Sequence, residues 1–335
     1  MTYNAIIIVK IRWFTIPSMF ILIEKGDNMN ETNLNVQTDT LKKRNMWIFT
    51  ATLVVLLIVG TILYGLRVLL LTAVAFAVSV LIEFAFAKMR KKPFDQEFMI
   101  TPLLVVLILP PGVPAWLVGI ATFFAVFFGK NIFGGSGKYI FSPALVGVLF
   151  VLISFPVQMS TNWLSQGGDL FTGATPLLSL FRGTDPYPFT MTQLLLGQAP
   201  GVTGETFRLG VLVLGILLLV LKIRDWKIPL SYLGFFTILT GLSYLLFDWG
   251  RDPILSLLTG GLLFGAFFVA SDPVLAPETS LGKVLYGFGL ALLTFIIRFF
   301  GTYAEGVTFA IILMSAVSPL IDSFTVKKKE SEVEA

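Results

Sequence analysis

Residues 46–64 read Met-Trp-Ile-Phe-Thr-Ala-Thr-Leu-Val-Val-Leu-Leu-Ile-Val-Gly-Thr-Ile-Leu-Tyr and include no charged side chain. A run of about 20 mainly apolar residues is long enough to cross the hydrocarbon core of a bilayer as a helix. Similar segments, some of them shorter, follow at 68–87, 97–110, 113–129, 140–156, 209–222, 229–247, 254–271, 282–298 and 304–322. The sequence therefore predicts an all-α polytopic membrane protein with about ten transmembrane helices.

The overall composition agrees with a membrane protein. Apolar residues make up 56% of the 335 positions and charged residues 13%, which lies outside the range of soluble globular domains. The chain has no Cys and no His, so it supplies no iron–sulfur ligands and lacks the usual haem and zinc ligands. No metal site is predicted, and electron transfer by this chain would need an organic cofactor.

The basic residues predict the topology. Lys and Arg cluster at 42–44, 88–92, 222–227 and 327–329, which all fall on one side of the membrane under this count. The positive-inside rule makes that side cytoplasmic. Both termini then lie on the cytoplasmic side of the cell membrane, and the long segment 157–208 lies on the outer side. Clusters confined to short loops indicate topology and give no sign of nucleic-acid binding.

The apolar segments divide the chain into five regions. Residues 1–45 form a cytoplasmic lead-in, 46–156 and 209–322 are two halves of five segments each, 157–208 is the outer loop, and 323–335 is a cytoplasmic tail. We interpret residues 1–28 as a start-site artefact. Codons for Glu24–Asp27 can spell a purine-rich ribosome-binding site, with Met29 at a suitable distance as the true start.

Five segments per half require that any duplication be inverted across the membrane. Phe127-Phe128-Gly129 is followed by Gly134, and Phe299-Phe300-Gly301 by Gly306, with the same spacing. This match fits two inverted five-helix repeats with broken helices, and it fits chance equally. Pro110-Pro111 is expected to end the third segment early and to leave free carbonyl groups, which are tolerated at membrane depth mainly beside a cavity.

The outer loop contains Gly168-Asp-Leu-Phe-Thr-Gly-Ala-Thr-Pro-Leu177. Gly173 and Ala174 leave the backbone open to another protein, and Pro176 fixes the exit of the chain. Thr, Gly and Pro are also ordinary turn residues, so a surface turn is the alternative interpretation. A Thr hydroxyl is a weak nucleophile and would need an external enzyme to receive a covalent group.

Five further blocks extend this motif into a family resemblance. They are Phe-Gly-Lys-Asn-Ile-Phe-Gly-Gly-Ser-Gly-Lys at 128–138, Phe-Ser-Pro-Ala-Leu-Val-Gly at 141–147, Ile-Ser-Phe-Pro-Val-Gln-Met at 153–159, Gly-Ala-Phe-Phe-Val-Ala-Ser-Asp-Pro at 265–273, and Arg-Phe-Phe-Gly-Thr-Tyr-Ala-Glu-Gly-Val-Thr-Phe-Ala at 298–310. With Asp169-x-x-Thr172-Gly173-Ala174-Thr175, they resemble the D subunit of Rnf-type ion-translocating electron-transport complexes over about 46–322. The B subunit of the sodium-pumping NADH:quinone reductase is a more distant resemblance.

The chain departs from the family pattern in three places. Ser142 stands where Asn is commoner before Pro-Ala, and Thr172 stands where Ser is commoner. The hydroxyl at position 172 is kept, so no loss of function is expected there. The longer N-terminal region of the quinone reductase's subunit is absent, which weakens the case for a quinone site.

The resemblance implies that Thr175 carries FMN through a phosphoester, within a flavinylation motif that includes Asp169, Thr172, Gly173 and Ala174. It also implies a flavin transferase for maturation and sister subunits in the membrane, including an outward-facing flavoprotein subunit and iron–sulfur subunits. Electrons would pass between flavins at the outer face while ferredoxin-linked or NADH-linked electron flow moves Na⁺ or H⁺. The chain would be a redox subunit of this translocase without a complete active site of its own. The resemblance leaves open whether the protein binds a second, non-covalent flavin.

A few polar side chains within or beside the apolar segments are candidates for an ion path or for cofactor surroundings: Glu83, Asn131, Lys138, Asp272, Arg298 and Glu305. Such residues usually face a bundle interior or a polar path. For Glu83 we favour function over snorkelling. For the others we favour structure: a tight turn between packed helices at Asn131 and Lys138, a helix-end cap at Asp272, and an ion pair between Arg298 and Glu305.

Two other functions fit part of the same pattern. One is a small-solute channel or facilitator of inverted-repeat fold with no redox role. The other is a stand-alone flavinylated conduit for extracellular electron transfer. The Thr175 segment favours a redox function over the facilitator, which has no use for it, and gene neighbours would distinguish the conduit.

Overall fold

The computed structural model describes residues 31–171, 173–183, 186–247, 250–301 and 305–333. The chain divides into two compact units, residues 1–42 and 43–335. In the first unit, residues 31–42 are described and form the first turns of helix α1 (Glu31–Tyr64). The predicted start at Met29, the interpretation of residues 1–28 and the prediction for Thr172 lie outside the described residues.

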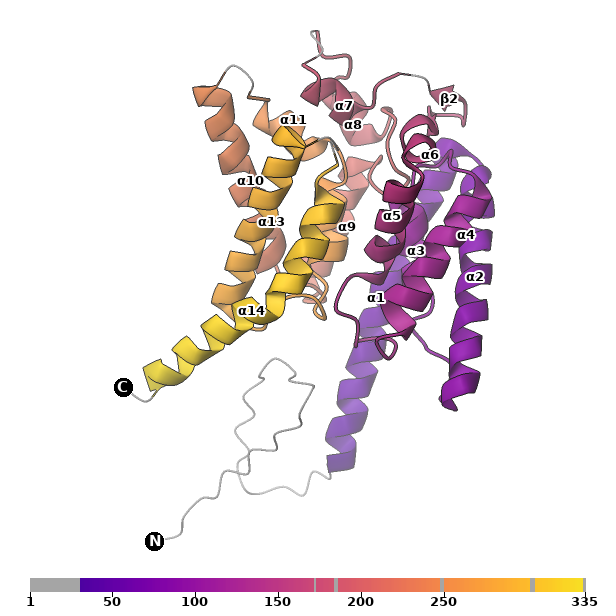
Figure 1. Ribbon diagram of the computed structural model, residues 1–335, viewed down its shortest axis with the longest axis vertical. Coiled ribbons are helices and arrows are strands. Elements are labelled where there is room, and N and C mark those ends of the chain that lie inside the picture. The colour runs from indigo at the N-terminus through magenta and orange to yellow at the C-terminus, as the bar shows by residue number, and fades with distance from the viewer. Residues whose placement is uncertain (1–30, 172, 184–185, 248–249, 302–304, 334–335) are drawn as a thin grey trace. The chain divides into compact units, whose positions relative to one another are not determined.

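Helices form the first predicted half (Figure 1). After α1 come α2 (Arg67–Arg90), α3 (Ile100–Ile108), α4 (Ala115–Phe124), the π-helix η1 (Ala125–Asn131) and α5 (Pro143–Ser154). Helix α2 packs against α3 and α4, and α5 packs against α3, α4 and η1. Pro143 begins α5 at a position where its missing N–H has no cost.

The predicted outer loop contains short elements. These are α6 (Pro156–Thr161), the antiparallel strands β1 (Trp163–Leu164) and β2 (Leu170–Phe171), α7 (Pro176–Phe181) and α8 (Met191–Leu196). The hairpin is attached to the last turn of α1, because the Gly167 N–H donates to the Leu63 carbonyl at 2.9 Å. In Figure 1, α7, α8 and β2 lie together at one end of the long helices.

The second half consists of α9 (Arg208–Val220), α10 (Lys227–Leu246), α11 (Pro253–Leu258), α12 (Leu262–Phe264), the π-helix η2 (Gly265–Ala270), α13 (Ser280–Phe300) and α14 (Val307–Val333). Helix α13 packs against both α10 and α14. Helix α14 also contacts α5, so the two halves meet there. The predicted segment 254–271 is not one helix, because residues 259–261 separate α11 from α12.

Five helices in the described part of the chain are long and apolar enough to cross a membrane: 40–64, 67–90, 227–246, 280–300 and 307–326. Three shorter apolar helices occupy 115–131, 143–154 and 208–220. The protein is therefore mainly helical and multi-pass, while the count of ten spans and the inverted repeat stay predictions. The two matched stretches differ locally, since Phe127–Gly129 lies in η1 and Phe299–Phe300 ends α13.

Helix α3 ends at Ile108, two residues before Pro110, as the sequence predicted. The carbonyl groups left free at this end accept hydrogen bonds from the loop before α9. Gly204 N–H donates to the Leu107 carbonyl at 2.7 Å, and Thr203 donates to the Leu109 carbonyl at 3.4 Å through both its N–H and its hydroxyl. The loop before α9 therefore enters the bundle and supplies hydrogen-bond donors to the carbonyl groups at the end of the broken helix.

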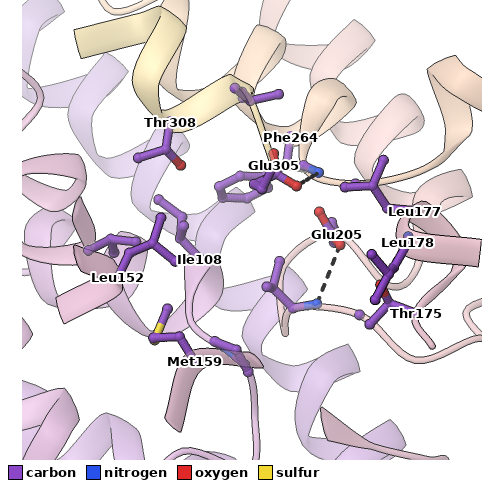
Figure 2. A pocket seen from close by; sticks show the side chains of 18 of the residues that line it. Ile108, Leu152, Met159, Thr175, Leu177, Leu178, Glu205, Phe264, Glu305 and Thr308 are labelled. Carbon is purple, nitrogen blue, oxygen red and sulfur yellow. Dashed lines mark hydrogen bonds between the residues drawn. The ribbon is translucent and has the colours of Figure 1, made fainter. Parts of the chain in front are cut away.

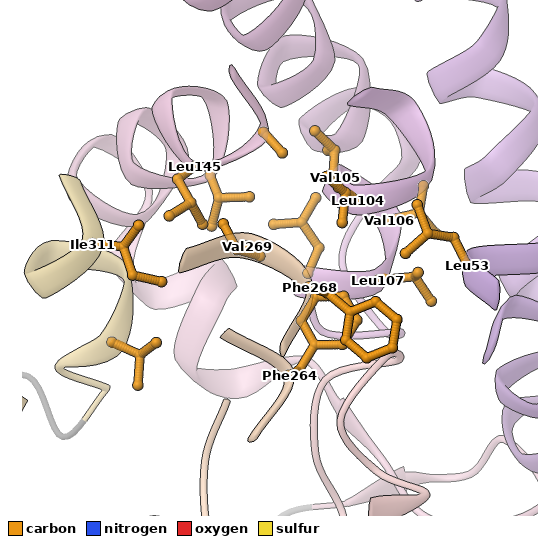
Figure 3. Packing of buried hydrophobic residues seen from close by; sticks show 14 of the residues in the cluster. Leu53, Leu104, Val105, Val106, Leu107, Leu145, Phe264, Phe268, Val269 and Ile311 are labelled. Atoms are coloured by element: carbon orange, nitrogen blue, oxygen red, sulfur yellow. The ribbon is translucent and has the colours of Figure 1, made fainter. Parts of the chain in front are cut away.

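Apolar side chains around η2 join the halves (Figure 3). Phe264 and Phe268 stack with ring centroids 5.0 Å apart, and both are almost completely buried. In Figure 3 they lie beside Leu107 of α3, with Leu53 of α1 close by. Because lipid tails are as apolar as these side chains, close van der Waals packing of the cluster would hold the broken helices together.

We predict opposite effects for two glycine substitutions. A methyl group on Gly147 of α5 would overlap the Ala121 carbonyl of α4, whereas Gly241 of α10 has open space around it. Gly147→Ala should lower the free energy of unfolding by about 1–3 kcal/mol through overpacking. Gly241→Ala should raise it by about 0.5–1 kcal/mol, because Ala favours a helix over Gly. Thermal unfolding of the detergent-purified protein tests this, and equal effects of both substitutions would contradict the packing described.

Candidate functional site

A cavity of about 470 Å³ lies between the two halves, next to α7 of the outer loop (Figure 2). Most of its wall is apolar and comes from helices that are far apart in sequence, with Ile108 of α3, Leu152 of α5 and Phe264 of α12 among the lining residues. Thr175, Glu205 and Glu305 add polar groups to the same wall. A volume of this size lies in the range of small-molecule sites, about 300–1,000 Å³.

Thr175 is positioned by the start of α7. It is the N-cap residue, and its Oγ1 accepts a hydrogen bond from the Leu178 N–H at 3.3 Å. Pro176 occupies the first helical position and fixes the exit of the chain. Thr175 is half-buried and lines the cavity, whereas Gly173, two residues earlier, is exposed.

The hairpin β1–β2 leads into this segment. The Asp169 carbonyl accepts hydrogen bonds from the Ser165 N–H at 2.9 Å and hydroxyl at 3.2 Å, and the Asp169 side chain is exposed. Ala174 is half-buried, and its carbonyl accepts a hydrogen bond from the Ser179 hydroxyl at 3.4 Å. The motif predicted from the sequence therefore presents Asp169 and Gly173 to the surroundings and Thr175 to the cavity.

Two carboxylates border the cavity. Glu205, in the loop before α9, is only 7% exposed, and its Oε1 accepts a hydrogen bond from the Val202 N–H at 3.4 Å. Its Oε2 has no hydrogen-bond partner within the described residues. Burial and, to a smaller extent, the charge of Glu305 together raise the pKa of Glu205 to about 7. Glu305, before α14, accepts a hydrogen bond from the Gly261 N–H at 3.3 Å.

Two buried arginines satisfy carbonyl groups at the break after α11. Arg208 donates to the Leu258 carbonyl, and also to the Leu194 and Thr206 carbonyls at 2.9 and 3.3 Å. Arg298 donates to the Ser256 carbonyl at 2.9 Å. The Arg298 Nη2 lies 4.0 Å from Glu305 Oε1, so the predicted ion pair is present at the outer limit of such contacts.

A second group of charges lies further along α2. Glu83 is 16 residues beyond Arg67 in this helix, or roughly 24 Å at 1.5 Å per residue, and Arg67 binds the Gly112 carbonyl near the hairpin end of the bundle. The Lys130 ammonium of η1 lies 2.7 Å from Glu83 Oε1 and 3.0 Å from Asp95 Oδ2. Glu83 and Lys130 are both almost completely buried. Glu83 is therefore neutralised inside the protein and does not reach its surface.

Asn131 and Lys138 flank the turn after η1, but they differ in environment. The Asn131 side chain donates to the Val126 carbonyl at 3.1 Å, and the Asn131 carbonyl accepts a hydrogen bond from Arg90. Asn131 thus closes the π-helix. Lys138 is exposed and lies in neither charged group, so the structural interpretation of this turn fits better than a role in a site.

Asp272 follows η2 and connects two elements. Its Oδ2 accepts a hydrogen bond from the Tyr139 hydroxyl at 2.8 Å, its Oδ1 lies 3.6 Å from Arg224 Nη1, and Oδ1 also accepts from the Val274 N–H at 3.1 Å. The guanidinium of Arg224 stacks over the Phe49 ring at 4.1 Å. These contacts stabilise the turn after η2, and the helix-end cap predicted for Asp272 stays a prediction.

Sequence reasoning missed Lys130, Asp95, Glu205, Arg208 and Arg224. Lys130 lies within the block 128–138, yet its position directly after an apolar segment was not used as a signal. Glu205 had a clearer signal, because it is the one acidic residue in the sequence from 186 to 224. An isolated acid between apolar stretches is a candidate for a buried carboxylate.

These features define a multi-pass helical membrane protein with a ligand-sized cavity at the site where two helices are broken. The chain belongs to the NQR2, RnfD, RnfE family, which matches residues 31–330. It is 35% identical over 310 residues to the D subunit of the proton-translocating ferredoxin:NAD(+) oxidoreductase complex of Clostridium ljungdahlii, covering 87% of this chain and 92% of the relative.

Two further relatives differ in what their names describe. The D subunit of the Na(+)-translocating ferredoxin:NAD(+) oxidoreductase complex of Acetobacterium woodii is 34% identical over 308 residues, which cover 89% of this chain and 95% of the relative. The B subunit of the Na(+)-translocating NADH-quinone reductase of Ectopseudomonas mendocina is 36% identical over 268 residues, which cover 76% of this chain and 66% of the relative. The predicted family is thus confirmed.

Lys130 and Lys138 give a matched pair of substitutions. Lys130→Met should lower the free energy of unfolding by about 3–5 kcal/mol, because it leaves Glu83 buried without a counter-ion. Lys138→Met changes an exposed side chain and should have an effect within about 0.5 kcal/mol. Thermal unfolding in detergent measures both.

A double substitution separates pairing from packing. Glu83→Gln combined with Lys130→Met should recover part of the stability lost in Lys130→Met, because the fully buried carboxylate is then uncharged and only the partly exposed Asp95 lacks its partner. If the two single losses simply add, the Glu83–Lys130 pair does not contribute to stability in the way the distances suggest.

Proposed function

We propose that this chain is a membrane subunit of an ion-translocating electron-transport complex and that it carries FMN as a phosphoester on Thr175. The observation that carries the proposal is the position of Thr175 on the wall of the 470 Å³ cavity, within a segment open to a modifying enzyme. Membership in a family whose relatives are named as subunits of ion-translocating oxidoreductases supports the same function.

The residues around Thr175 suit a flavin. The cavity is large enough for a small aromatic ligand, and its wall is mostly apolar with few polar groups, as cofactor sites usually are. Arg182 and Thr175 lie on the same lining and would lie near a phosphoester. When bound, FMN would supply the electron-carrying chemistry that the amino acids of this chain lack.

The chain itself would anchor, shield and orient the cofactor. Thr175 provides the covalent attachment, and the fixed geometry of α7 limits where an attached group can reach. Apolar side chains such as Leu177, Leu152 and Phe264 keep water from the wall of the cavity, which strengthens electrostatic interactions within it. The buried carboxylate of Glu205 supplies negative charge or a proton at the same wall.

The partners follow from the proposed function. A subunit of this kind needs sister subunits, and we propose an outward-facing flavoprotein subunit, iron–sulfur subunits, a flavin transferase for maturation, and membrane lipid around the helices. The names of the relatives include both proton-translocating and Na(+)-translocating complexes. The ion moved by the complex that contains this chain is therefore Na⁺ or H⁺. The positive-inside rule supports a position of Thr175 on the outer face of the membrane, which is part of this proposal.

Peptide mass spectrometry after co-expression with a flavin transferase tests the attachment. The peptide that contains Thr175 should gain the mass of FMN less water, and the band should fluoresce in a gel. Thr175→Ala should abolish both signals and electron transfer without unfolding the protein, because the residue lies in a loop segment. Thr192→Ala, which changes an exposed threonine outside the motif, is the matched control and should keep the flavin. If Thr175→Ala keeps the flavin and Thr172→Ala loses it, the assignment of Thr175 as the residue that carries FMN is wrong. An unmodified peptide with an active transferase would favour the facilitator.

Glu83→Gln tests a role in ion movement. Within the assembled complex, this change should slow coupled ion movement more than reduction of the flavin, because Glu83 is buried far along α2 from the Thr175 segment. Ion uptake into proteoliposomes and flavin absorbance give the two rates. Equal loss of both rates would indicate that Glu83 acts only in structure.

A further inference from the structure

Two carboxylates from distant parts of the chain face one glycine at the break between α11 and α12. A methyl group placed on Gly261 would lie 3.1 Å from Glu205 Oε2 and 3.5 Å from Glu305 Oε1. Two acidic oxygens thus lie within 3.5 Å of one point that no side chain fills. Figure 2 shows both glutamates next to one another in the cavity that Thr175 borders.

The titratable groups around the two glutamates leave Glu205 without a cation of its own. They are Tyr64 of α1, Arg182 after α7, Arg208 of α9, Tyr232 of α10 and Arg298 of α13. Arg208 donates to carbonyl groups, and the Tyr64 hydroxyl pairs with Thr206 Oγ1 at 2.6 Å. Arg298 donates through Nη1 to the Ser256 carbonyl, and its Nη2 lies 4.0 Å from Glu305 Oε1. Arg182 lies at the rim of the cavity. Within the described residues, Glu205 forms no ion pair with any of them.

An ionised carboxylate in this position is unfavourable. Glu205 is more than nine-tenths buried and its Oε2 accepts no hydrogen bond from the described residues, and an unpaired buried charge costs several kcal/mol. A second carboxylate close by adds repulsion. A proton or a small cation between the two would remove both costs. Glu305 has a side chain that is 35% exposed, so it gives such a cation a route into the site.

We propose that Glu205 and Glu305 form a site for one monovalent cation, a proton or Na⁺, beside the group carried on Thr175. Its link to electron transfer rests on the proposed function. One cation taken up from solvent would balance the negative charge of one electron that a partner flavoprotein delivers to the flavin. The same cation would leave when the electron leaves, so that no net charge accumulates at the buried wall.

Infrared spectroscopy of the purified complex tests the site without using the flavin. With Thr175→Ala as background, a protonated-carboxyl band should disappear as the pH rises through about 7, the pKa of Glu205. The band should be absent in Glu205→Gln and unchanged in the control Glu278→Gln, which alters an exposed glutamate. Replacing choline by Na⁺ at fixed pH should leave the band unchanged for a proton site and remove it for a Na⁺ site.

Glu305→Gln keeps the test decisive if Glu205→Gln fails to fold. Without the charge of Glu305, the pH at which the Glu205 band is half lost should decrease, because the neighbouring carboxylate no longer opposes ionisation. A titrating band with the same midpoint in Glu305→Gln and in the unaltered protein would show that the two residues do not form one site. Absence of any band or Na⁺ effect attributable to Glu205 would overturn the proposal.

The midpoint potential of the flavin on Thr175 then tests the coupling. If one cation binds for each electron, the midpoint potential of the unaltered complex shifts by up to about 59 mV for each tenfold change in cation concentration. In Glu205→Gln this shift should become smaller by up to that amount. Glu278→Gln should leave the dependence unchanged. Equal dependence in Glu205→Gln and in the unaltered complex would overturn the coupling. If Thr175 carries no flavin, the proposed function fails, while the infrared result still decides whether the cation site exists.

Discussion

Backbone carbonyl groups left free by broken helices are the constraint on which the cavity wall depends. Lipid offers no hydrogen-bond donors, so an unpaired carbonyl at membrane depth costs several kcal/mol. The loop 201–206 supplies donors to the end of α3, and Arg208 and Arg298 supply donors to the end of α11. Because one loop contains Glu205 and leads directly into Arg208, closing the first break also places a carboxylate and a guanidinium at the second.

Among the residues that the structure describes, the buried glutamates Glu83 and Glu205 have different surroundings. Lys130 is held between Glu83 and Asp95 at 2.7 and 3.0 Å, so that buried carboxylate already has its counter-ion. Glu205 is buried almost as deeply, yet the arginines beside it bind carbonyl groups. The first arrangement stabilises a fixed pair, whereas the second leaves a carboxylate oxygen available to something that enters the cavity. Burial alone would not distinguish these two glutamates; the partners do.

Sequence patterns predicted where helices lie far better than what surrounds the site. The segment expected at 68–87 is α2 at 67–90, because hydropathy and length fix a span directly. The division of 254–271 into α11 and α12 was missed, since two glycines in an apolar run hardly change its hydropathy. Lys138 was chosen over Lys130, although both are lysines of one block; only the fold buries Lys130 and exposes Lys138. Thr175 and Glu305 were both candidates, but nothing in the sequence placed them on one cavity.

The two breaks are made by different residues, and the difference matters for function. Pro110 and Pro111 have no N–H and cannot donate at the break after α3, where the loop 201–206 binds the Leu107 and Leu109 carbonyls. At the other break, Gly260 adopts a positive φ of 68°, and the Gly261 N–H is free to bind Glu305. A side chain at Gly260 would meet both Arg298 and Glu305. The glycine pair therefore sets how closely a carboxylate, a guanidinium and the segment after Thr175 approach one another, and a helix that was merely interrupted by proline could not bring them together.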